Sequence, residues 1–75
     1  MTRELAIALI RRGCLLRVSR DGSAAAIVDP YAGGRAWQFV ARHVVDELLN
    51  HPRDGERLKK QREEANADFY NLQVS

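Results

Sequence analysis

The sequence is poor in the residues that usually hold a very small domain together. Its single cysteine, Cys14, excludes a disulfide within the chain and suits a reducing compartment. Metal sites need several clustered cysteine, histidine or carboxylate ligands, and Cys14, His43 and His51 do not have such a spacing. We therefore expect no disulfide and no metal, and no motif in the chain indicates another cofactor.

Long apolar runs are also missing. The longest one near the N-terminus covers only residues 5–10. A signal peptide needs an apolar stretch of roughly 7–15 residues, and a membrane-spanning helix needs about 20. We therefore expect a cytoplasmic protein that does not contact a membrane.

The short length limits the hydrophobic core. The chain has 75 residues, of which 45% are hydrophobic and 29% charged, and these fractions are typical of a globular domain rather than a disordered chain. A domain of this size buries only about 60% of the surface that its unfolded chain exposes. Because no disulfide or metal can add stability, the sequence predicts that two copies associate into a homodimer.

The N-terminal segment predicts a helix over residues 3–12. Thr2 can cap this helix because its hydroxyl can accept a hydrogen bond from a free backbone N–H. Gly13 follows the last turn and can end the helix in the left-handed conformation.

A β-hairpin is expected next. Asp21-Gly22 between two apolar runs indicates a tight two-residue turn that joins strands 14–19 and 24–29. Because side chains alternate along a strand, this turn also fixes which residues share a face. The predicted pairs on one face are Val18 with Ala25 and Leu16 with Ile27.

Residues 35–40 allow two interpretations. The alternation of Trp37 and Phe39 indicates a third strand, whereas apolar residues from Trp37 to Leu48 also fit the spacing of a helix. We favour the strand, because short aromatic and β-branched runs after a Gly-Gly pair are typical of strands. A helix over 41–50 follows. We expect Trp37 and Phe39 in the core, since so small a domain needs its large side chains inside.

Residues 53–75 differ in composition from the compact core predicted over 1–52. Asp54 can cap a helix over about 55–70, in which apolar residues recur every seven positions on an otherwise polar surface. Such a thin stripe cannot hold a helix to a core over its full length, so we expect it to form a dimer or partner seam. The predicted seam residues are Leu58, Ala65, Phe69 and Leu72.

These elements predict an α+β fold with a helix, an antiparallel hairpin, a third strand, a second helix and a C-terminal amphipathic helix. The order over 1–52 resembles that of double-stranded RNA-binding folds and of the small HicA-type toxins built on them. Those toxins carry a histidine in the early strands, whereas residues 23–26 read Ser-Ala-Ala-Ala. A winged helix is the competing architecture, but only one short helix precedes the hairpin.

No arrangement in the sequence indicates catalysis. General acid–base chemistry needs titratable groups gathered in one concave site. Cys14 directly follows a helix stop, and His43 and His51 lie in or beside the second helix. We therefore expect a protein that is not an enzyme.

Positive charge is concentrated at the front of the chain. Residues 1–20 carry a net charge of +4, residues 46–75 carry −2, and the whole chain carries +2. Arginine binds phosphate through two parallel hydrogen bonds, so a basic helix–hairpin surface can follow a nucleic-acid backbone. The candidate contacts to a nucleic acid or another partner are Arg11, Arg12, Arg17, Arg20, Tyr31 and Arg35.

Two functions follow from these observations. The leading hypothesis is a non-enzymatic interaction module that binds and regulates or inhibits another macromolecule. Small phage proteins that inhibit host machinery, such as anti-CRISPR inhibitors, are similar in build, which is an analogy of size and organisation. The alternative is a small DNA- or RNA-binding regulator that uses the basic helix–hairpin surface.

Overall fold

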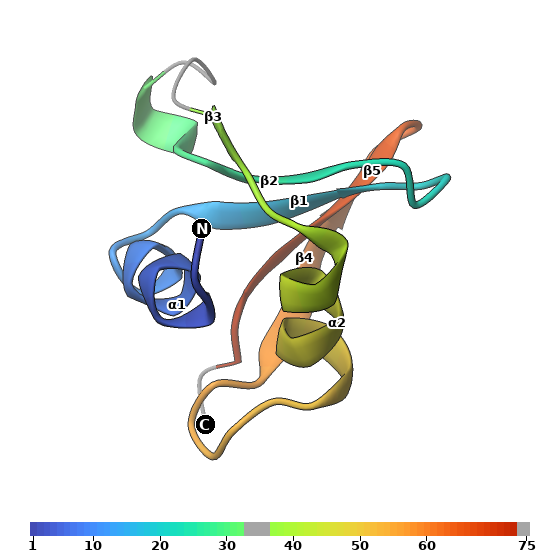
Figure 1. Cartoon of the computed structure of the whole chain (residues 1–75). Helices are drawn as coiled ribbons and strands as arrows, with labels where there is room; N and C mark the ends of the chain where they lie inside the picture. Colours follow the sequence, from blue (N-terminus) through green and yellow to red (C-terminus); the bar gives the residue numbers. More distant parts are fainter. Residues whose placement is uncertain (33–36, 74–75) are drawn as a thin grey trace.

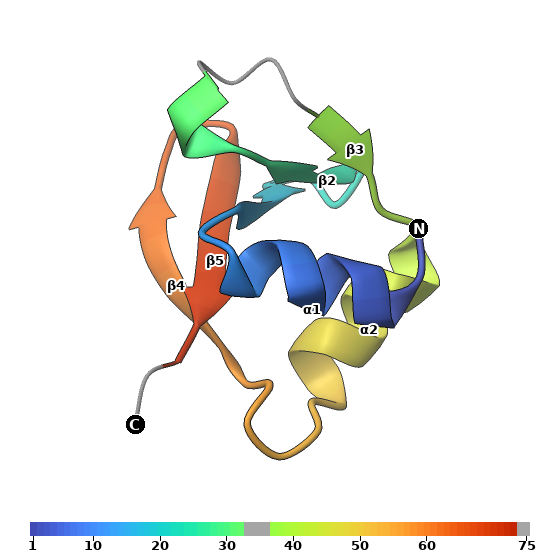
Figure 2. The same ribbon diagram turned by 90° about the vertical axis from the view of Figure 1, so that its left-hand side faces the viewer.

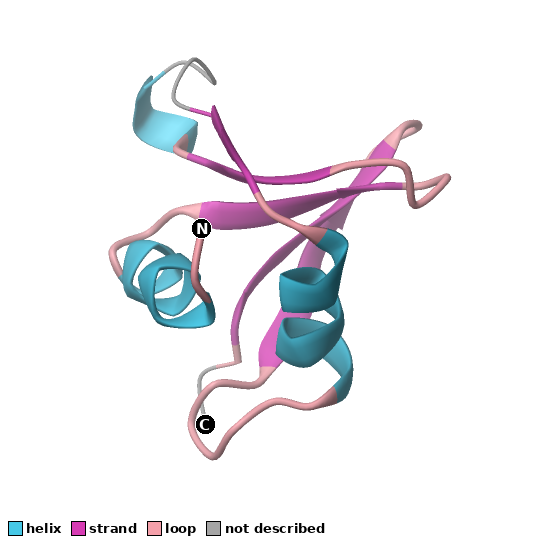
Figure 3. Ribbon diagram, in the orientation of Figure 1, coloured by secondary structure: helices cyan, strands magenta, loops and turns pink. Residues whose placement is uncertain are grey.

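The computed structural model describes residues 1–32 and 37–73. Within these ranges the chain forms helices, strands and one short 3₁₀ helix, which Figure 3 distinguishes by colour. In chain order the elements are α1 (Arg3–Arg11), β1 (Leu15–Ser19), β2 (Ala25–Val28), η1 (Pro30–Ala32), β3 (Trp37–Phe39), α2 (Arg42–Asn50), β4 (Leu58–Glu63) and β5 (Ala67–Leu72).

The strands form one antiparallel sheet in the order β3-β2-β1-β5-β4. Both α-helices lie on the same side of this sheet (Figure 1), and the sheet curves around them (Figure 2). The α+β class is therefore confirmed. The main core lies between the sheet and the two helices, where the fully buried large side chains are Ile10, Leu16 and Leu48.

The first helix begins and ends as the sequence predicts. The Thr2 hydroxyl accepts a hydrogen bond from the Leu5 N–H at 3.2 Å, and Gly13 follows the C-cap with φ = +109°. A side chain is strained at this φ, so glycine suits the position. Ala6, Ile7 and Ile10 form the buried face of α1.

The hairpin has the predicted register but a longer turn. Leu16 pairs with Ile27 and Val18 with Ala25. The last ladder bond runs from the Ser19 N–H to the Ala24 carbonyl at 2.9 Å, so residues 20–23 form a four-residue loop. Among the described residues, positive φ occurs only at glycines, so Asp21 does not adopt the mirror-image turn that we expected.

The Asp21 carboxylate closes this loop by hydrogen bonding. It accepts from the Ser23 hydroxyl at 2.7 Å and from the Ser23 N–H at 2.9 Å. These bonds favour the charged carboxylate and lower the pKa of Asp21. The loop thus keeps the predicted strand register, but Arg20 and Ser23 belong to the loop and not to the β1–β2 ladder.

The third strand is confirmed over Trp37–Phe39, and the second helix over Arg42–Asn50. Residues 35 and 36 of the predicted strand, and the side chain of Trp37, lie outside the described part of the chain. The expectation that Phe39 is in the core is wrong, because its side chain is 74% exposed. Its register partner Ala26 belongs to the sheet face opposite the helices, which explains the exposure.

The predicted C-terminal helix is wrong, because residues 58–72 form β4 and β5 instead. Strand β5 pairs with β1 along one edge and with β4 along the other. The Arg20 N–H also donates to the Asn66 carbonyl at 2.8 Å at the end of the β1–β5 ladder. These long-range backbone bonds outweigh the local helix preference of a segment rich in Lys, Gln and Glu.

The four predicted seam residues consequently do not line one helix face. Leu58 and Leu72 are register partners and pack against the main core. Phe69 is buried in a second cluster with Val28 and Ala67, and Ala65 is exposed before β5 begins. The residues at seven-residue spacing therefore lie in two different strands and in the connection between them.

We predict that truncation after residue 57 prevents cooperative folding. The truncated chain loses β4 and β5, so β1 loses its second neighbour and the core loses Tyr70 and Leu72. Near-UV circular dichroism and thermal melting should show no cooperative transition in the truncated chain, with the full chain as the reference. A truncated chain that melts cooperatively would contradict a fold built around the β1–β5 pairing.

Candidate functional site

The side of the sheet opposite α1 and α2, here called the outer face, is not covered by any α-helix that the structure describes. Side chains alternate between the two faces of a strand, so register partners share a face across the sheet. One residue from each strand therefore falls in a single row on the outer face. From β3 to β4 this outer-face row is Phe39, Ala26, Arg17, Phe69 and Arg62.

The aromatic ring near one end of the row is covered, and the ring at the other end is exposed to solvent. Phe69 is only 6% exposed, and the Arg62 guanidinium carbon lies 4.4 Å from the centre of its ring. This cation–π contact covers the ring with a cation. At the other end, Phe39 is 74% exposed. The outer face therefore presents one free aromatic ring at one end of the row and a packed aromatic–arginine pair at the other, with Ala26 and Arg17 between them.

A groove of about 360 Å³ lies on the same face. Its apolar residues come from β1, β2, η1 and β5, and its charged residues are two arginines and two carboxylates. The lining residues are Leu15, Arg17, Val28, Asp29, Pro30, Arg62, Glu64 and Phe69. Since the two cations are matched by two anions, the groove has no dominant sign of charge.

The charged groups of the groove are already oriented by contacts within the protein. Arg17 is half-buried and donates to the Ser19 hydroxyl at 3.4 Å. Arg62 lies 3.5 Å from the Glu64 carboxylate, and Asp29 accepts from the Tyr31 N–H at 2.9 Å. The groove is therefore a preformed surface, and a partner that binds it need not order these side chains.

The predicted basic residues separate into three places. Arg11 and Arg12 are exposed at the C-terminal end of α1. Arg17 lies in the middle of β1, and Arg20 lies just beyond the end of β1. The length of β1, roughly 17 Å, therefore separates Arg11 and Arg12 from Arg20. The structure thus does not gather the four arginines into one patch.

Arg20 is held by the C-terminal hairpin. Its Nη2 atom lies 2.9 Å from Asp68 Oδ1 and donates to the Glu64 carbonyl at 2.6 Å. Arg11 and Arg12 have no ion-pair partner in residues 1–32 or 37–73. Arg35, the remaining predicted basic contact, lies outside the described residues.

Tyr31 lies beside the end of α1. It is 89% exposed, and its Cε2 atom is 3.5 Å from the place a Cβ at Gly13 would occupy. The structure therefore brings Tyr31 near Arg11 and Arg12, which directly precede Gly13. This end of the molecule is a second, smaller candidate contact surface.

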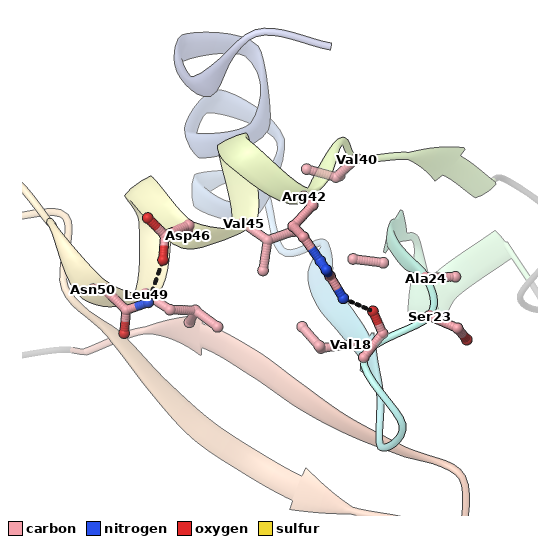
Figure 4. Close-up of a pocket in the computed structure, with 11 residues that line it drawn as sticks. Val18, Ser23, Ala24, Val40, Arg42, Val45, Asp46, Leu49 and Asn50 are labelled. Atoms are coloured by element: carbon pink, nitrogen blue, oxygen red, sulfur yellow. Dashed lines mark hydrogen bonds between the residues drawn. The ribbon is translucent and has the colours of Figure 1, made fainter.

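A further groove of about 340 Å³ lies between α2 and the β1–β2 turn, on the helix side of the sheet (Figure 4). Its polar side chains bond to neighbouring groups of the protein. Arg42 reaches across to donate to the Gly22 carbonyl at 3.0 Å, and Asn50 donates to Asp46 at 2.6 Å. Because Arg42 joins α2 to the turn, we interpret this groove as part of the packing between them.

Several features of the outer face could not be found from local sequence patterns. Arg62 becomes a neighbour of Phe69 only when β4 and β5 pair, and we predicted a helix there. The one available signal was the alternation of Ala67, Asp68 and Phe69, which is typical of a half-buried strand. The sequence predicts strands at Leu15 and Val28, but no local pattern marks them as part of a binding surface.

Titratable groups are scattered over the described residues. No group of three or more His, Cys, Asp and Glu side chains is close enough there to hold a metal ion. His51 Nε2 lies 3.9 Å from an Asp46 carboxylate oxygen on the surface. Neither described α-helix is long and apolar enough to cross a bilayer.

Cys14 is half-buried at the start of β1. Burial raises the pKa of its thiol, the Asp29 carboxylate raises it further, and the Arg12 guanidinium partly opposes both. The thiolate is the nucleophilic form, so this environment lowers reactivity at neutral pH.

The two phenylalanines of the outer-face row make a matched test of the packing. Phe69→Ala should destabilise the protein by about 3 kcal/mol, because it empties a buried site. At protein concentrations where the chain is monomeric, Phe39→Ala should change stability by less than about 0.5 kcal/mol, because its ring is mostly in water there. Urea unfolding of the two variants measures both values, and equal losses would contradict the described burial.

We predict that folded protein reacts slowly with iodoacetamide through Cys14. At pH 8 the raised thiol pKa leaves less thiolate in the folded chain than in the same chain unfolded in urea. Asp29→Asn should speed the folded-state reaction, since it removes an anion that opposes the thiolate. Mass spectrometry follows the alkylation, and a folded rate equal to the unfolded rate would refute the assignment.

Comparison of the chain with protein-family models, with curated proteins and with solved structures finds no match. A fold of this class accommodates many unrelated functions, so function has to be inferred from the chemistry of its surfaces. The outer face combines a free aromatic ring, a preformed groove and paired charges, and we take it as the candidate functional site.

Proposed function

We propose that this chain is a small non-enzymatic interaction module that binds another protein with the outer face of its sheet. The observation that carries the proposal is the outer-face row, in which half-buried Arg17 lines a preformed groove and exposed Phe39 lies two strands away on the same face. By occupying a surface of its partner, such a module regulates or inhibits it. This is the mode of action of small phage-encoded inhibitors, to which the chain is analogous in size.

The chemistry of the row is that of a protein interface. Aromatic residues and arginine are enriched at protein–protein contacts, and they carry much of the binding free energy when they become buried. Phe39 supplies an exposed ring two strands from Arg17, and Leu15 and Val28, the next outer-face pair along β1 and β2, supply part of the apolar floor. Burial of these groups by a partner releases water from apolar surface.

The charges favour a protein over a nucleic acid as the occupant. Asp29 and Glu64 line the same groove as Arg17 and Arg62, so a phosphate backbone there would meet anions as well as cations. The ring of Phe69 is covered by Arg62 and cannot stack on a base. A partner that presents an apolar side chain flanked by charges of both signs fits better.

A nucleic-acid partner is the second candidate, and a different observation favours it. Arg11 and Arg12 are exposed, and the described residues include no ion-pair partner for either of them. Highly exposed Tyr31 lies beside the same end of α1. Two unpaired guanidinium groups and a ring can contact phosphate and base together.

Comparative capture from a lysate of the organism that encodes the protein tests the first proposal. Immobilised wild-type chain, Arg17→Glu and Phe39→Ser are compared with Leu5→Ser, which changes a 47% exposed apolar residue on α1. We expect one protein to bind the wild-type chain and Leu5→Ser, and to fall at least about 10-fold with each outer-face variant, the loss typical of an interface anchor. Quantitative mass spectrometry after nuclease treatment measures this.

The two candidates give opposite results in the same experiment. Equal capture by all four proteins would refute binding through the outer face. Loss of capture on nuclease treatment, together with salt-sensitive binding that Arg11→Ala and Arg12→Ala abolish, would establish the nucleic-acid candidate instead.

A further inference from the structure

The two edges of the sheet differ in how they are protected. Strands β3 and β4 are the outermost strands of the described sheet, so each has one row of backbone groups without a strand partner there. An unpaired edge is a template for pairing with another chain, and natural proteins block it with charges, bulges or short strands. The side chains of the two edge strands therefore indicate which edge is protected against pairing with another chain.

The β4 edge has two of these protective features. Its sequence is Leu-Lys-Lys-Gln-Arg-Glu, and its ladder with β5 shifts register between Lys60 and Arg62. A second β4 strand placed against it would bring several cations close together. We therefore expect β4 to stay free of strand partners.

The β3 edge has no charged side chain, since its sequence is Trp-Gln-Phe. The Val40 N–H donates to the Ala25 carbonyl at 2.9 Å. Hydrogen-bonded and non-bonded pairs alternate in an antiparallel ladder, so Gln38 also bonds toward β2. The backbone groups of Trp37 and Phe39 consequently point away from the sheet, toward the free edge.

We infer that two copies of the chain pair antiparallel through their β3 strands, about a twofold axis at Gln38. Phe39 of one copy then lies opposite Trp37 of the other, and the outward N–H and C=O groups of both residues bond across the axis. The edge is thus complementary to itself, as a twofold interface requires. This inference does not rest on the proposed function, but the two share Phe39, so a partner of the dimer would bind the joined outer faces of both copies.

The arrangement also accounts for the exposure of Phe39. Opposite residues of paired strands share a face, so the outer faces of both copies join across the axis. The two Phe39 rings, each 74% exposed in one copy, then lie close to the second copy and lose part of their contact with water. A homodimer of this kind supplies stability that the small core of a 75-residue chain lacks.

Gln38 allows a direct charge-swap test. It faces its own counterpart in a non-bonded pair, where side chains of opposite strands approach most closely. Gln38→Lys and Gln38→Glu should each weaken the dimer by roughly 10-fold, because each places like charges across the axis. An equimolar mixture of the two variants should restore a dimer, because it places opposite charges there.

Sedimentation equilibrium measures the association of each protein and of the mixture. Gln61→Lys and Gln61→Glu are the matched controls on the β4 edge, and they should leave the dimer unchanged. A second readout needs no variant, since hydrogen exchange at the Trp37 and Phe39 amides should slow as the wild-type concentration rises. Circular dichroism checks that each Gln38 variant is folded.

Several results would overturn the inference. A wild-type chain that stays monomeric up to about 1 mM has no such dimer, even if β3 accepts a strand from another protein. If Gln38→Lys and Gln38→Glu leave the association constant of the dimer unchanged, the dimer uses a different interface. Failure of the mixture to recover, when both variants are folded monomers, would also refute pairing across Gln38.

Discussion

The pairing of β5 with β1 is the constraint on which the rest of the structure depends. It joins Leu16 to Tyr70 and Ser19 to Ala67, which lie about 50 residues apart in the chain. Closing so long a loop has an entropic cost that the new ladder and the burial of Ala67 and Phe69 must offset. In return, β1 becomes the central strand, and one sheet links the N-terminal hairpin to the C-terminal hairpin.

The same pairing creates the two different faces of the sheet. Both helices occupy one side, so Leu16 and Tyr70 face the main core and Arg17 and Phe69 face outward. Without β5, Arg17 would be an isolated cation at a strand edge. With β5 and β4 in place, it adjoins an aromatic ring that Arg62 covers, within a row that ends at exposed Phe39. The candidate surface is therefore a product of tertiary pairing.

Sequence reasoning succeeded where the determining contacts are local. The cap at Thr2, the stop at Gly13 and the register of Leu16 with Ile27 each depend on residues within about ten positions of one another. It failed over 55–70, because three apolar positions at seven-residue spacing fit a helix as well as two strands. The short alternation over residues 67–69 is the one local sign of a strand, and the unpaired edge of β1, which no local pattern reveals, decides between them.

The uneven charge along the sequence has a related structural explanation. The front carries +4 and the tail −2, and folding brings parts of both together. Arg20 lies 2.9 Å from Asp68, and Arg3, whose side chain is 10% exposed, lies 3.6 Å from Glu56 and 4.0 Å from Glu47. The partly exposed Arg20–Asp68 pair stabilises little, but both sets of contacts reduce the positive field that a phosphate backbone would meet. Folding thus pairs part of the basic front of the chain with carboxylates from its second half.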